Sequence, residues 1–579
     1  MESEYIIQVE NLTWYYEGTS KAALNNINLK IKKGETVLIT GPAGAGKTTL
    51  AYCLNGIIPH FFPGYLQGRV LIKNIDTRTV EIGDISRMVG MVLQDYSAQL
   101  VQPTVIDDVA FALENFGFDP DEIQKRVEEA ITITGLTGLE NRNPHTLSGG
   151  EQQLCAIAGV LALKPEIIVL DEPVSSLDPI GAEKVSNLLR KLKEKENITM
   201  IIIEQRLDEF ISWADKLIVL NEGKIIAEGK PLDVLNDYEK LELMVRYRVN
   251  VPQLFLLYYK LKKTYNLPPL KSLNVKDFPI DFLLDRPLKV TIKEHDFYNV
   301  NPKLDPIIMI RNLTYVYPNG VKALNNINVE FYQGEFVAII GQNGSGKTTL
   351  LKHILGLLKP TSGKVIVCGL DTSVHDVTEI SKYVGMVFQH PDRQLFKTQV
   401  KDEIAMSLRR FKLTREEMER RIDDILKLVE LQNYKNHGTF NLGLGERKRL
   451  ALAATLATQP KILLVDEPTT GQDLKLKIEI MELLKRLNEQ TNITIIFVSH
   501  DMEIVAKYAK RSIIMSNGKI LIDGPTSKVL RNFEILAKAH LKPPPIIELC
   551  ELLKNYNFQL ERILTVEDFL ESLNISYEE

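Results

Sequence analysis

The pattern of apolar and polar positions predicts a mostly parallel α/β architecture that occurs twice along the chain. In the first half, apolar runs at residues 36–40 and 167–170 are separated by loops and helical segments. Similar runs at residues 337–340 and 462–465 follow in the second half, and each half contains a further strand-like run. Such runs, alternating with helical patterns, are typical of buried parallel strands. We therefore expect two parallel cores.

Each half also contains a segment that is rich in charge and has helical periodicity. These segments cover residues 119–134 and 414–429 and lie between the strand-like runs, while β-rich stretches stand near the start of each half. The expected fold class is α/β, with two tandem domains. Each domain is expected to combine a mostly parallel core, an antiparallel β part and a helical subdomain.

The two halves are copies of one unit. The stretch "NNINLKIKKGETVLITGPAGAGKTTL" returns as "NNINVEFYQGEFVAIIGQNGSGKTTL". Gly41 corresponds to Gly341, an offset of 300, whereas Glu172 corresponds to Glu467, an offset of 295. The difference of five indicates an extra loop in the first copy, near residues 59–67. A repeat of this size indicates a duplicated domain, not a solenoid module.

The repeat extends beyond the two cores. We expect the cores at residues 1–240 and 306–525 and helical appendages at 241–305 and 526–579. Each appendage begins with prolines, and "VPQLFLLYYKLKKTYNLPPLKSLNVKDF" resembles "PPPIIELCELLKNYNFQLERILTVEDF". The linker between the cores is therefore predicted to be part of the duplicated unit.

Composition excludes several classes of protein. The 579 residues are 44% hydrophobic and 25% charged, and no run approaches the roughly 20 apolar residues that span a bilayer. The amino terminus does not have the pattern of a signal peptide. Four scattered cysteines suggest neither a disulfide framework nor a zinc or iron–sulfur site. A net charge of −5 argues against a nucleic-acid partner, which usually leaves a basic footprint.

Two glycine-rich loops have the chemistry of phosphate binding. Residues 41–48 and 341–348 both satisfy G-x-x-x-x-G-K-[ST] behind an apolar strand. The glycines let backbone N–H groups converge on phosphate oxygens, and the lysines Lys47 and Lys347 should reach the β- and γ-phosphates. The threonine hydroxyls that follow should ligate Mg²⁺. A chance glycine-rich turn is a poor explanation when both copies carry the motif.

An acid pair follows a later apolar run in each copy. Asp171 and Asp466 are expected to hold Mg²⁺, and Glu172 and Glu467 to polarise the water that attacks the γ-phosphate. A solvated pair of acids at a strand end would be the simpler reading of one copy alone. The candidate metal ligands are Thr48, Gln94, Asp171, Thr348, Gln389 and Asp466.

The segment Leu147-Ser-Gly-Gly-Glu-Gln152 resembles the signature of ATP-binding cassette (ABC) ATPases, and both cores resemble this family almost end to end. The resemblance implies ATP with Mg²⁺, adenine stacked on a tyrosine, and head-to-tail pairing of the two domains within the chain. Each ATP is then shared between one phosphate loop and the other domain's signature. The nucleotide-binding candidates are Tyr16, Gly41, Gly44, Gly46, Lys47, Thr48, Thr49, Tyr317, Gly341, Gly344, Gly346, Lys347, Thr348, Thr349, Ser148, Gly149, Gly150, Gly443 and Gly445.

Two departures from the family pattern predict unequal sites. The second signature has Gly443 and Leu444 where the first has Ser and Gly, and Gln205 stands where the second copy has the switch residue His500. Head-to-tail pairing assigns both departures to the first-domain site. We expect that site to bind ATP but to turn over slowly. The catalytic candidates are Glu467, His500, Gln389, Glu172, Gln94 and Gln205.

The segments that follow Gln94 and Gln389 resemble energy-coupling-factor importer ATPases, which serve vitamin and transition-metal uptake. Gln99-Leu100 and Gln394-Leu395 match a Gln-Leu step of that group, and the C-terminal appendages resemble its tails. The resemblance implies a transmembrane coupling subunit, a substrate-binding membrane subunit and a peripheral position at the cytoplasmic face of the membrane. A soluble tandem ATPase acting on ribosomes or nucleic acid, or an exporter ATPase, is the alternative.

Overall fold

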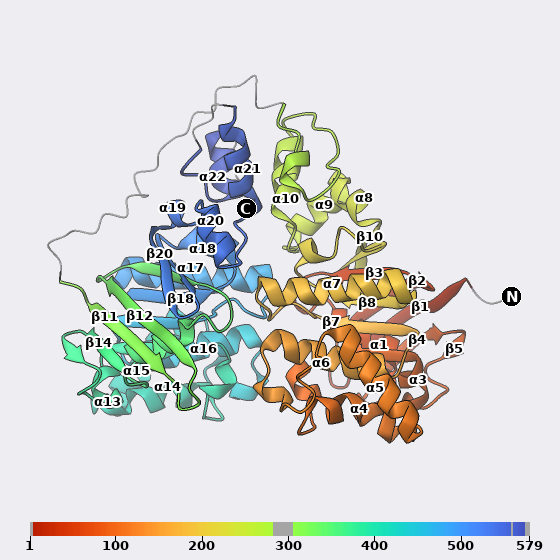
Figure 1. The fold of residues 1–579 in the computed structure, drawn as a ribbon, viewed down its shortest axis with the longest axis horizontal. Helices are drawn as coiled ribbons and strands as arrows, with labels where there is room; N and C mark the ends of the chain where they lie inside the picture. The colour runs from red at the N-terminus through yellow and green to blue at the C-terminus, as the bar shows by residue number, and fades with distance from the viewer. Residues whose placement is uncertain (1–3, 282–304, 557–559, 574–579) are drawn as a thin grey trace. The chain divides into compact units, whose positions relative to one another are not determined.

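The computed structural model describes residues 4–281, 305–556 and 560–573. The chain divides into two compact units, Met1–Asp285 and Arg286–Glu579, and each contains one copy of the repeat (Figure 1). Part of the expected appendage at 241–305, residues 282–304, lies outside the described residues.

A six-stranded sheet forms the core of the first unit, in the order β10-β9-β3-β8-β7-β6. Its strands are β3 (Thr36–Thr40), β6 (Val89–Val92), β7 (Ile167–Asp171), β8 (Thr199–Ile203), β9 (Lys216–Asn221) and β10 (Lys224–Gly229). All neighbours pair in parallel except β9 and β10. Every residue of β3, β7 and β8 is buried, which agrees with their unbroken apolar sequences.

A second, antiparallel sheet lies in the same unit, in the order β2-β1-β4-β5. Its strands are β1 (Tyr5–Tyr16), β2 (Leu24–Lys32), β4 (Gly64–Ile72) and β5 (Ile75–Asp76). Buried side chains of β1, β2 and β4 share one hydrophobic core with β3, β7 and β8. This sheet is the predicted antiparallel part.

The helices of the first unit include a separate group of three. The helices are α1 (Lys47–Asn55), α2 (Ile57–His60), α3 (Ile82–Met88), α4 (Val105–Asn115), α5 (Pro120–Thr134), α6 (Gly149–Ala162), α7 (Pro179–Glu196), α8 (Pro231–Asn236), α9 (Tyr238–Arg246) and α10 (Gln253–Lys262). Helices α4, α5 and α6 pack on one another and form the helical subdomain (Figure 1).

The second unit has the same two sheets, in the orders β12-β11-β14-β15 and β16-β17-β18-β13-β19-β20. The strands are β11 (Ile308–Val316), β12 (Lys322–Phe331), β13 (Phe336–Ile340), β14 (Ser362–Val367), β15 (Leu370–Asp371), β16 (Val384–Val387), β17 (Ile462–Asp466), β18 (Thr494–Ser499), β19 (Arg511–Ser516) and β20 (Lys519–Pro525). Only β20 is antiparallel in the larger sheet.

The second unit also has its own helical subdomain, in which α14, α15 and α16 pack together. Its helices are α12 (Lys347–Ile354), α13 (Val377–Ile380), α14 (Val400–Leu408), α15 (Arg415–Leu428), α16 (Leu444–Leu456), α17 (Leu474–Thr491), α18 (Met502–Tyr508), α19 (Thr526–Val529), α20 (Phe533–Lys538), α21 (Pro545–Lys554) and α22 (Val566–Ser572). The expected α/β fold class, with parallel cores, antiparallel parts and helical subdomains, is confirmed.

Local sequence explains where the subdomain helices begin and end. Asp119 caps α5 through the backbone N–H of residue 121, Pro120 occupies the first turn, and Gly135 ends the helix at φ +74°. Thr414 and Glu417 form a capping box at the start of α15. None of the helices in the described ranges combines the length and the apolar character needed to cross a bilayer.

Candidate active site

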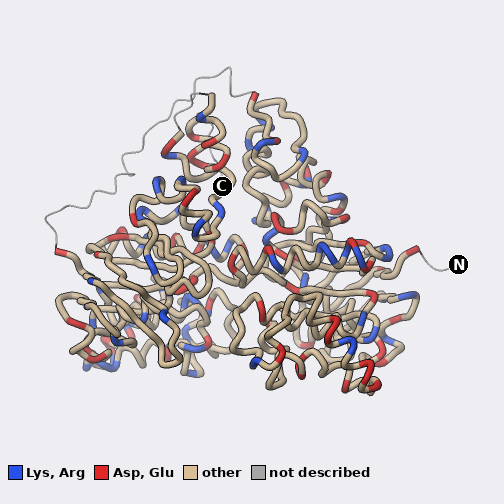
Figure 2. The backbone as a smooth tube through the Cα atoms, viewed as in Figure 1, with Lys and Arg blue, Asp and Glu red and all other residues tan. Residues whose placement is uncertain are grey.

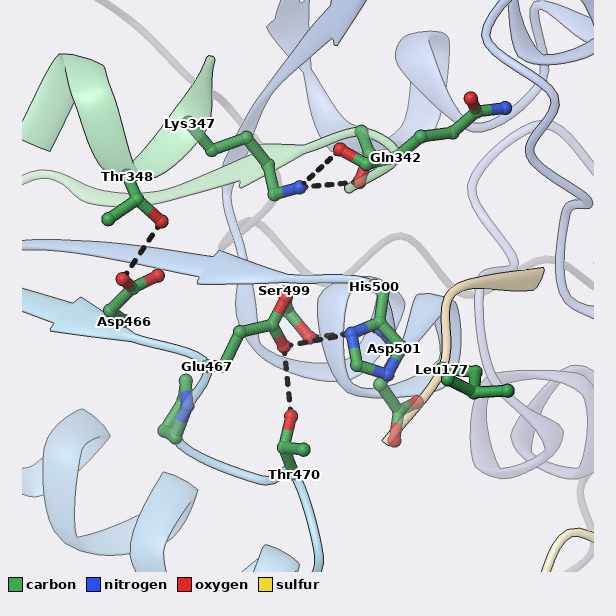
Figure 3. Close-up of polar contacts among 12 residues, drawn as sticks. Leu177, Gln342, Lys347, Thr348, Asp466, Glu467, Thr470, Ser499, His500 and Asp501 are labelled. Carbon is green, nitrogen blue, oxygen red and sulfur yellow. Dashed lines mark hydrogen bonds and ion pairs between the residues drawn. The ribbon is translucent and has the colours of Figure 1, made fainter. Parts of the chain in front are cut away.

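The two phosphate loops connect a buried strand to a helix, β3 to α1 in the first unit and β13 to α12 in the second. Lys47 Nζ donates to two carbonyl oxygens of its own loop, at 2.7 and 2.9 Å. Lys347 Nζ does the same at 2.8 and 2.7 Å (Figure 3). Both ammonium groups are buried, so each loop holds a positive charge beside the start of its helix.

The glycines of these loops leave room for a ligand. A Cβ atom at Gly46 would lie 2.5 Å from the carbonyl oxygen of Ala23, so packing requires glycine there. At Gly44 and Gly344, φ is +73° and +77°, and a Cβ atom would meet no protein atom within 4 Å. Open space beside backbone amides and a lysine is suited to a phosphate group. The loops therefore fit the ATP phosphates.

A hydroxyl group and a carboxylate lie together next to each loop. Thr348 Oγ1 donates to Asp466 Oδ2 at 3.0 Å (Figure 3). Burial raises the pKa of Asp171 to about 6, and the hydroxyl of Thr48 opposes this shift. Burial also raises the pKa of Asp466. Two hard oxygen ligands of this kind suit Mg²⁺, whose charge would favour the ionised carboxylates.

The glutamate that follows β17 is held by two donors. Glu467 Oε2 lies 2.9 Å from His500 Nδ1 and accepts a hydrogen bond from Thr470 Oγ1 at 3.1 Å (Figure 3). Burial by itself would raise the pKa of Glu467, but the charges of His500 and Lys347 and the hydroxyl of Thr470 outweigh burial and lower the pKa. The carboxylate is therefore kept ionised, as an acceptor for a water proton must be.

The corresponding glutamate of the first unit has neutral partners. Gln94 Nε2 donates to Glu172 Oε2 at 2.9 Å, and Gln205 Nε2 donates to Glu172 Oε1 at 2.8 Å. Gln389 follows β16 in the position that matches Gln94, but no hydrogen bond connects it to Glu467 in the described part of the chain. Each glutamate thus has two hydrogen-bond donors. Only the pair in the second unit includes a side chain that can carry a positive charge, that of His500.

A buried carboxyl group lies behind Glu172. Glu204 stands where the second unit has Ser499, and its carboxylate accepts three backbone N–H groups, at 2.8, 3.1 and 3.1 Å. Burial first, and then the charge of Glu172, raises the pKa of Glu204 to about 7. The sequence signal for Glu204 was the contrast between "IIIEQR" and "IFVSHD" at the ends of the corresponding strands β8 and β18.

The two candidate adenine-stacking tyrosines are connected to the helices after the phosphate loops. Tyr16 and Thr49 share a hydrogen bond of 3.1 Å between their hydroxyl groups, and so do Tyr317 and Thr349. In the first unit the edge of Phe62, from the five-residue insertion, also meets Tyr16, with ring centroids 6.0 Å apart. Both tyrosines are therefore positioned beside their loops.

The signatures lie at the starts of α6 and α16. Ser148 caps α6 in a reciprocal box with Glu151, to which its hydroxyl donates at 2.7 Å. Gly443 takes the same position in front of α16 without a side-chain cap. A Cβ atom at Gly445 would lie 2.8 Å from the side chain of Leu476. The altered signature therefore retains its helix but has lost a hydroxyl group at the helix start.

In each unit the structure brings the lysine, the acid pair and the switch residue to the carboxyl ends of adjacent parallel strands. Sequence reasoning missed Thr470, Glu204 and the buried Lys448. The available signal for each was a difference between the repeats, namely "DEPTT" against "DEPVS", "SHD" against "EQR", and "GERKR" against "GEQQL".

Comparison with known proteins gives consistent results. The family model described as "ABC transporter" matches residues 24–175 and 324–470. A candidate ABC transporter ATP-binding protein of Caldanaerobacter subterraneus subsp. tengcongensis is 41% identical over 97% of this chain and 99% of its own length. One from Methanosarcina mazei is 37% identical over 99% and 98%.

Among solved structures, cbiO1 from Clostridium perfringens is described as part of the ABC transporter complex cbiONQ. It is 36% identical, with a TM-score of 0.39, and the match covers 43% of this chain and 99% of that one.

Proposed function

Since this chain belongs to the family of ABC transporter ATP-binding proteins, we propose that its ATPase activity drives an importer of the energy-coupling-factor type, for a vitamin or a metal ion. ATP binding and hydrolysis are properties of this family. The transmembrane parts are separate proteins, a coupling subunit and a small substrate-binding subunit. The chain acts as a peripheral protein at the cytoplasmic face of the membrane.

Within each unit the residues divide the work of hydrolysis. The loop amides and the lysine bind the phosphates and balance their charge. Thr48 with Asp171, and Thr348 with Asp466, would hold Mg²⁺, which would supply positive charge to balance that of the phosphate oxygens. Gln94 and Gln389 are the further candidate ligands of this metal. The glutamate after each aspartate orients and polarises the attacking water.

The two sites have unequal activity in this proposal. Glu467 has the imidazole of His500 as a partner, whereas Glu172 is held by two amides. The domains pair head to tail, so Ser148, Gly149 and Gly150 complete the second-unit site. Gly443 and Gly445 face the first-unit phosphates without a serine hydroxyl. Losing a charge-assisted hydrogen bond of this kind slows a step by about tenfold to a hundredfold.

Two segments support coupling to a membrane protein. Gln99 accepts from the backbone of Leu93 at 2.8 Å and donates to that of Met91 at 3.1 Å. In the second unit Gln394 makes the matching bonds, to Met386 in β16 and to Phe388 just after it. One residue beyond each Gln-Leu step, Val101 is 59% exposed and Phe396 is 72% exposed. The proposal depends on one observation. In each unit, an exposed apolar side chain lies two residues after a glutamine that is hydrogen-bonded to the end of a strand of the larger sheet.

Co-purification tests the proposed function. The affinity-tagged chain, extracted from native membranes, should bring down a helical membrane protein and a small substrate-binding membrane protein. The double variant V101D/F396D should lose these subunits, because charge in an apolar contact is strongly unfavourable, and should still bind ATP. V374D is the matched control, since Val374 is also exposed (80%) but lies in another segment.

The other outcomes decide between the alternatives. Retained subunits in V101D/F396D would exclude these segments as the contact. Ribosomes in place of membrane subunits would identify a soluble tandem ATPase, although Lys, Arg, Asp and Glu are interspersed over both units without a basic stripe in view (Figure 2). A membrane partner without a small substrate-binding subunit would favour an exporter.

A further inference from the structure

The helix behind the altered signature carries three basic residues where α6 has Gln-Gln-Leu. In α16, Arg447 Nη1 donates to Asp392 at 2.7 Å, in the segment that follows Gln389. Arg449 Nη1 donates to Glu479 of α17 at 3.1 Å. Lys448, between them, points into the unit. The second signature helix is thus attached by charge to three other parts of its own unit.

The contacts of Lys448 lead to the catalytic glutamate. Its side chain is buried, and Nζ donates to the carbonyl oxygens of Pro468 at 3.0 Å and Thr470 at 2.9 Å. The hydroxyl of that same Thr470 donates to Glu467 Oε2 at 3.1 Å (Figure 3). Both carbonyls belong to the turn that follows β17. The ammonium group therefore holds the backbone of Thr470 itself and that of Pro468, two residues before it.

We propose that Lys448 is a positioning residue for hydrolysis, which fixes the turn after β17 so that Thr470 holds the carboxylate of Glu467 ready to accept a proton from water. The inference rests on the proposed role of Glu467. The proposal also gives α16 a role within its own unit. Although the start of this helix lacks the serine, its first turns support Glu467, which belongs to the site that we propose to be the more active.

The first unit lacks this chain of contacts. Gln153 occupies the place of Lys448 and is buried, but neither its Oε1 nor its Nε2 has a hydrogen-bond partner among the residues that the structure describes. Ser175 occupies the place of Thr470, and its hydroxyl donates to the backbone oxygen of Glu172 at 3.3 Å, not to the carboxylate. The connection from signature helix to glutamate is therefore specific to the second unit.

Electrostatics favours the same arrangement. Burial lowers the pKa of Lys448 to about 8, the charge of Glu467 raises it, and that of Lys477 lowers it further. At neutral pH the ammonium form therefore still predominates. This ammonium group is the donor to both carbonyl oxygens of the turn.

The test is steady-state ATPase activity of the purified full-length chain, with kcat and KM for ATP measured separately. K448M and T470V should each lower kcat by about five- to tenfold, as expected for loss of one oriented hydrogen bond to a charged group, with KM within about twofold. The double variant should fall no further than either single one, because both act through one contact. T470S should retain most of the activity. Q153M, the matched change in the first unit, should leave kcat unchanged.

E467Q separates the possible failures. If E467Q retains wild-type kcat, the proposed role of Glu467 is wrong. If E467Q lowers kcat while K448M and T470V leave it within about twofold, only the positioning role of Lys448 is wrong. A rise in KM as large as the fall in kcat would also overturn the positioning role. So would a double variant in which the fall in kcat equals the product of the two single falls. If K448M does not fold, K448Q replaces it, because the first unit has a buried glutamine, Gln153, at the matching position.

Discussion

At the scale of single residues, the two copies differ in the side chains that contact Glu172 in the first unit and Glu467 in the second. The second unit uses His500 and Thr470, whereas the first uses two glutamine amides and places Glu204 behind Glu172. A carboxyl group buried beside another carboxylate is held in its neutral form at higher pH than usual. At this position the first unit therefore has a group with a pKa near neutrality, whereas the second unit has Ser499.

Glu204 makes the stability of the first unit depend on pH. Burial and the charge of Glu172 raise the pKa of Glu204 to about 7 in the folded chain. Its contribution to the free energy of unfolding is therefore fully present below the unfolded pKa of 4.5 and is lost as pH rises through about 7. Urea unfolding of wild type and of E204Q between pH 4.5 and 8 should therefore diverge, with wild type losing up to roughly 3 kcal/mol relative to the variant. Arg206 faces the same carboxylate and opposes the shift. A difference that stays constant over this range would contradict the assignment.

At the scale of elements, the strand–loop–helix segment has two kinds of glycine. Gly46 is required by packing, because a side chain there would collide with a backbone carbonyl. Gly44 has a left-handed φ of +73° and open space, which suits a phosphate group. One loop thus combines a packing constraint at Gly46 with a conformational constraint and a candidate phosphate space at Gly44.

Substitution by alanine should separate these constraints. G44A should cost about 1–2 kcal/mol of stability through its left-handed φ alone, and should abolish ATP binding at the first-unit loop because Cβ fills the space for phosphate. G46A should be clearly less stable than G44A. Equilibrium dialysis with ATP and thermal unfolding measure the two effects. G138A is the control, since Gly138 has φ +87° and equally open space outside the loop. Normal ATP stoichiometry in G44A would refute the fit to phosphate.

At the scale of the whole molecule, duplication gives two phosphate loops and two signatures with different chemistry. The hydroxyl of Ser148 stands in front of α6, and no such group stands in front of α16. Under head-to-tail pairing, the serine serves the site that contains Glu467. Replacing Ser148 should therefore slow ATP turnover at the same site as replacing Glu467.

Mutant ATPase rates should reveal this pairing. E467Q should lower steady-state turnover by more than about tenfold, and E172Q should lower it less. S148A should also reduce the rate, and adding S148A to E467Q should cause little further loss, because both act on one site. Equal losses in the two glutamine variants, or a larger loss in E172Q, would argue against unequal sites. Independent losses in S148A/E467Q would argue against the pairing.

The sequence by itself determined the duplicated α/β architecture, the two phosphate loops and the acid pairs. These features depend on local spacing, since a buried strand followed by a glycine loop or by two acids can be read along the chain. Only the tertiary structure decided which groups touch each carboxylate. Gln205 reaches Glu172 because neighbouring parallel strands bring the two residues together, and Lys448 reaches Pro468 because its helix packs beside the turn. Thr470 reaches back to Glu467 within one turn. Those contacts depend on side-chain direction and burial, which spacing along the chain does not encode.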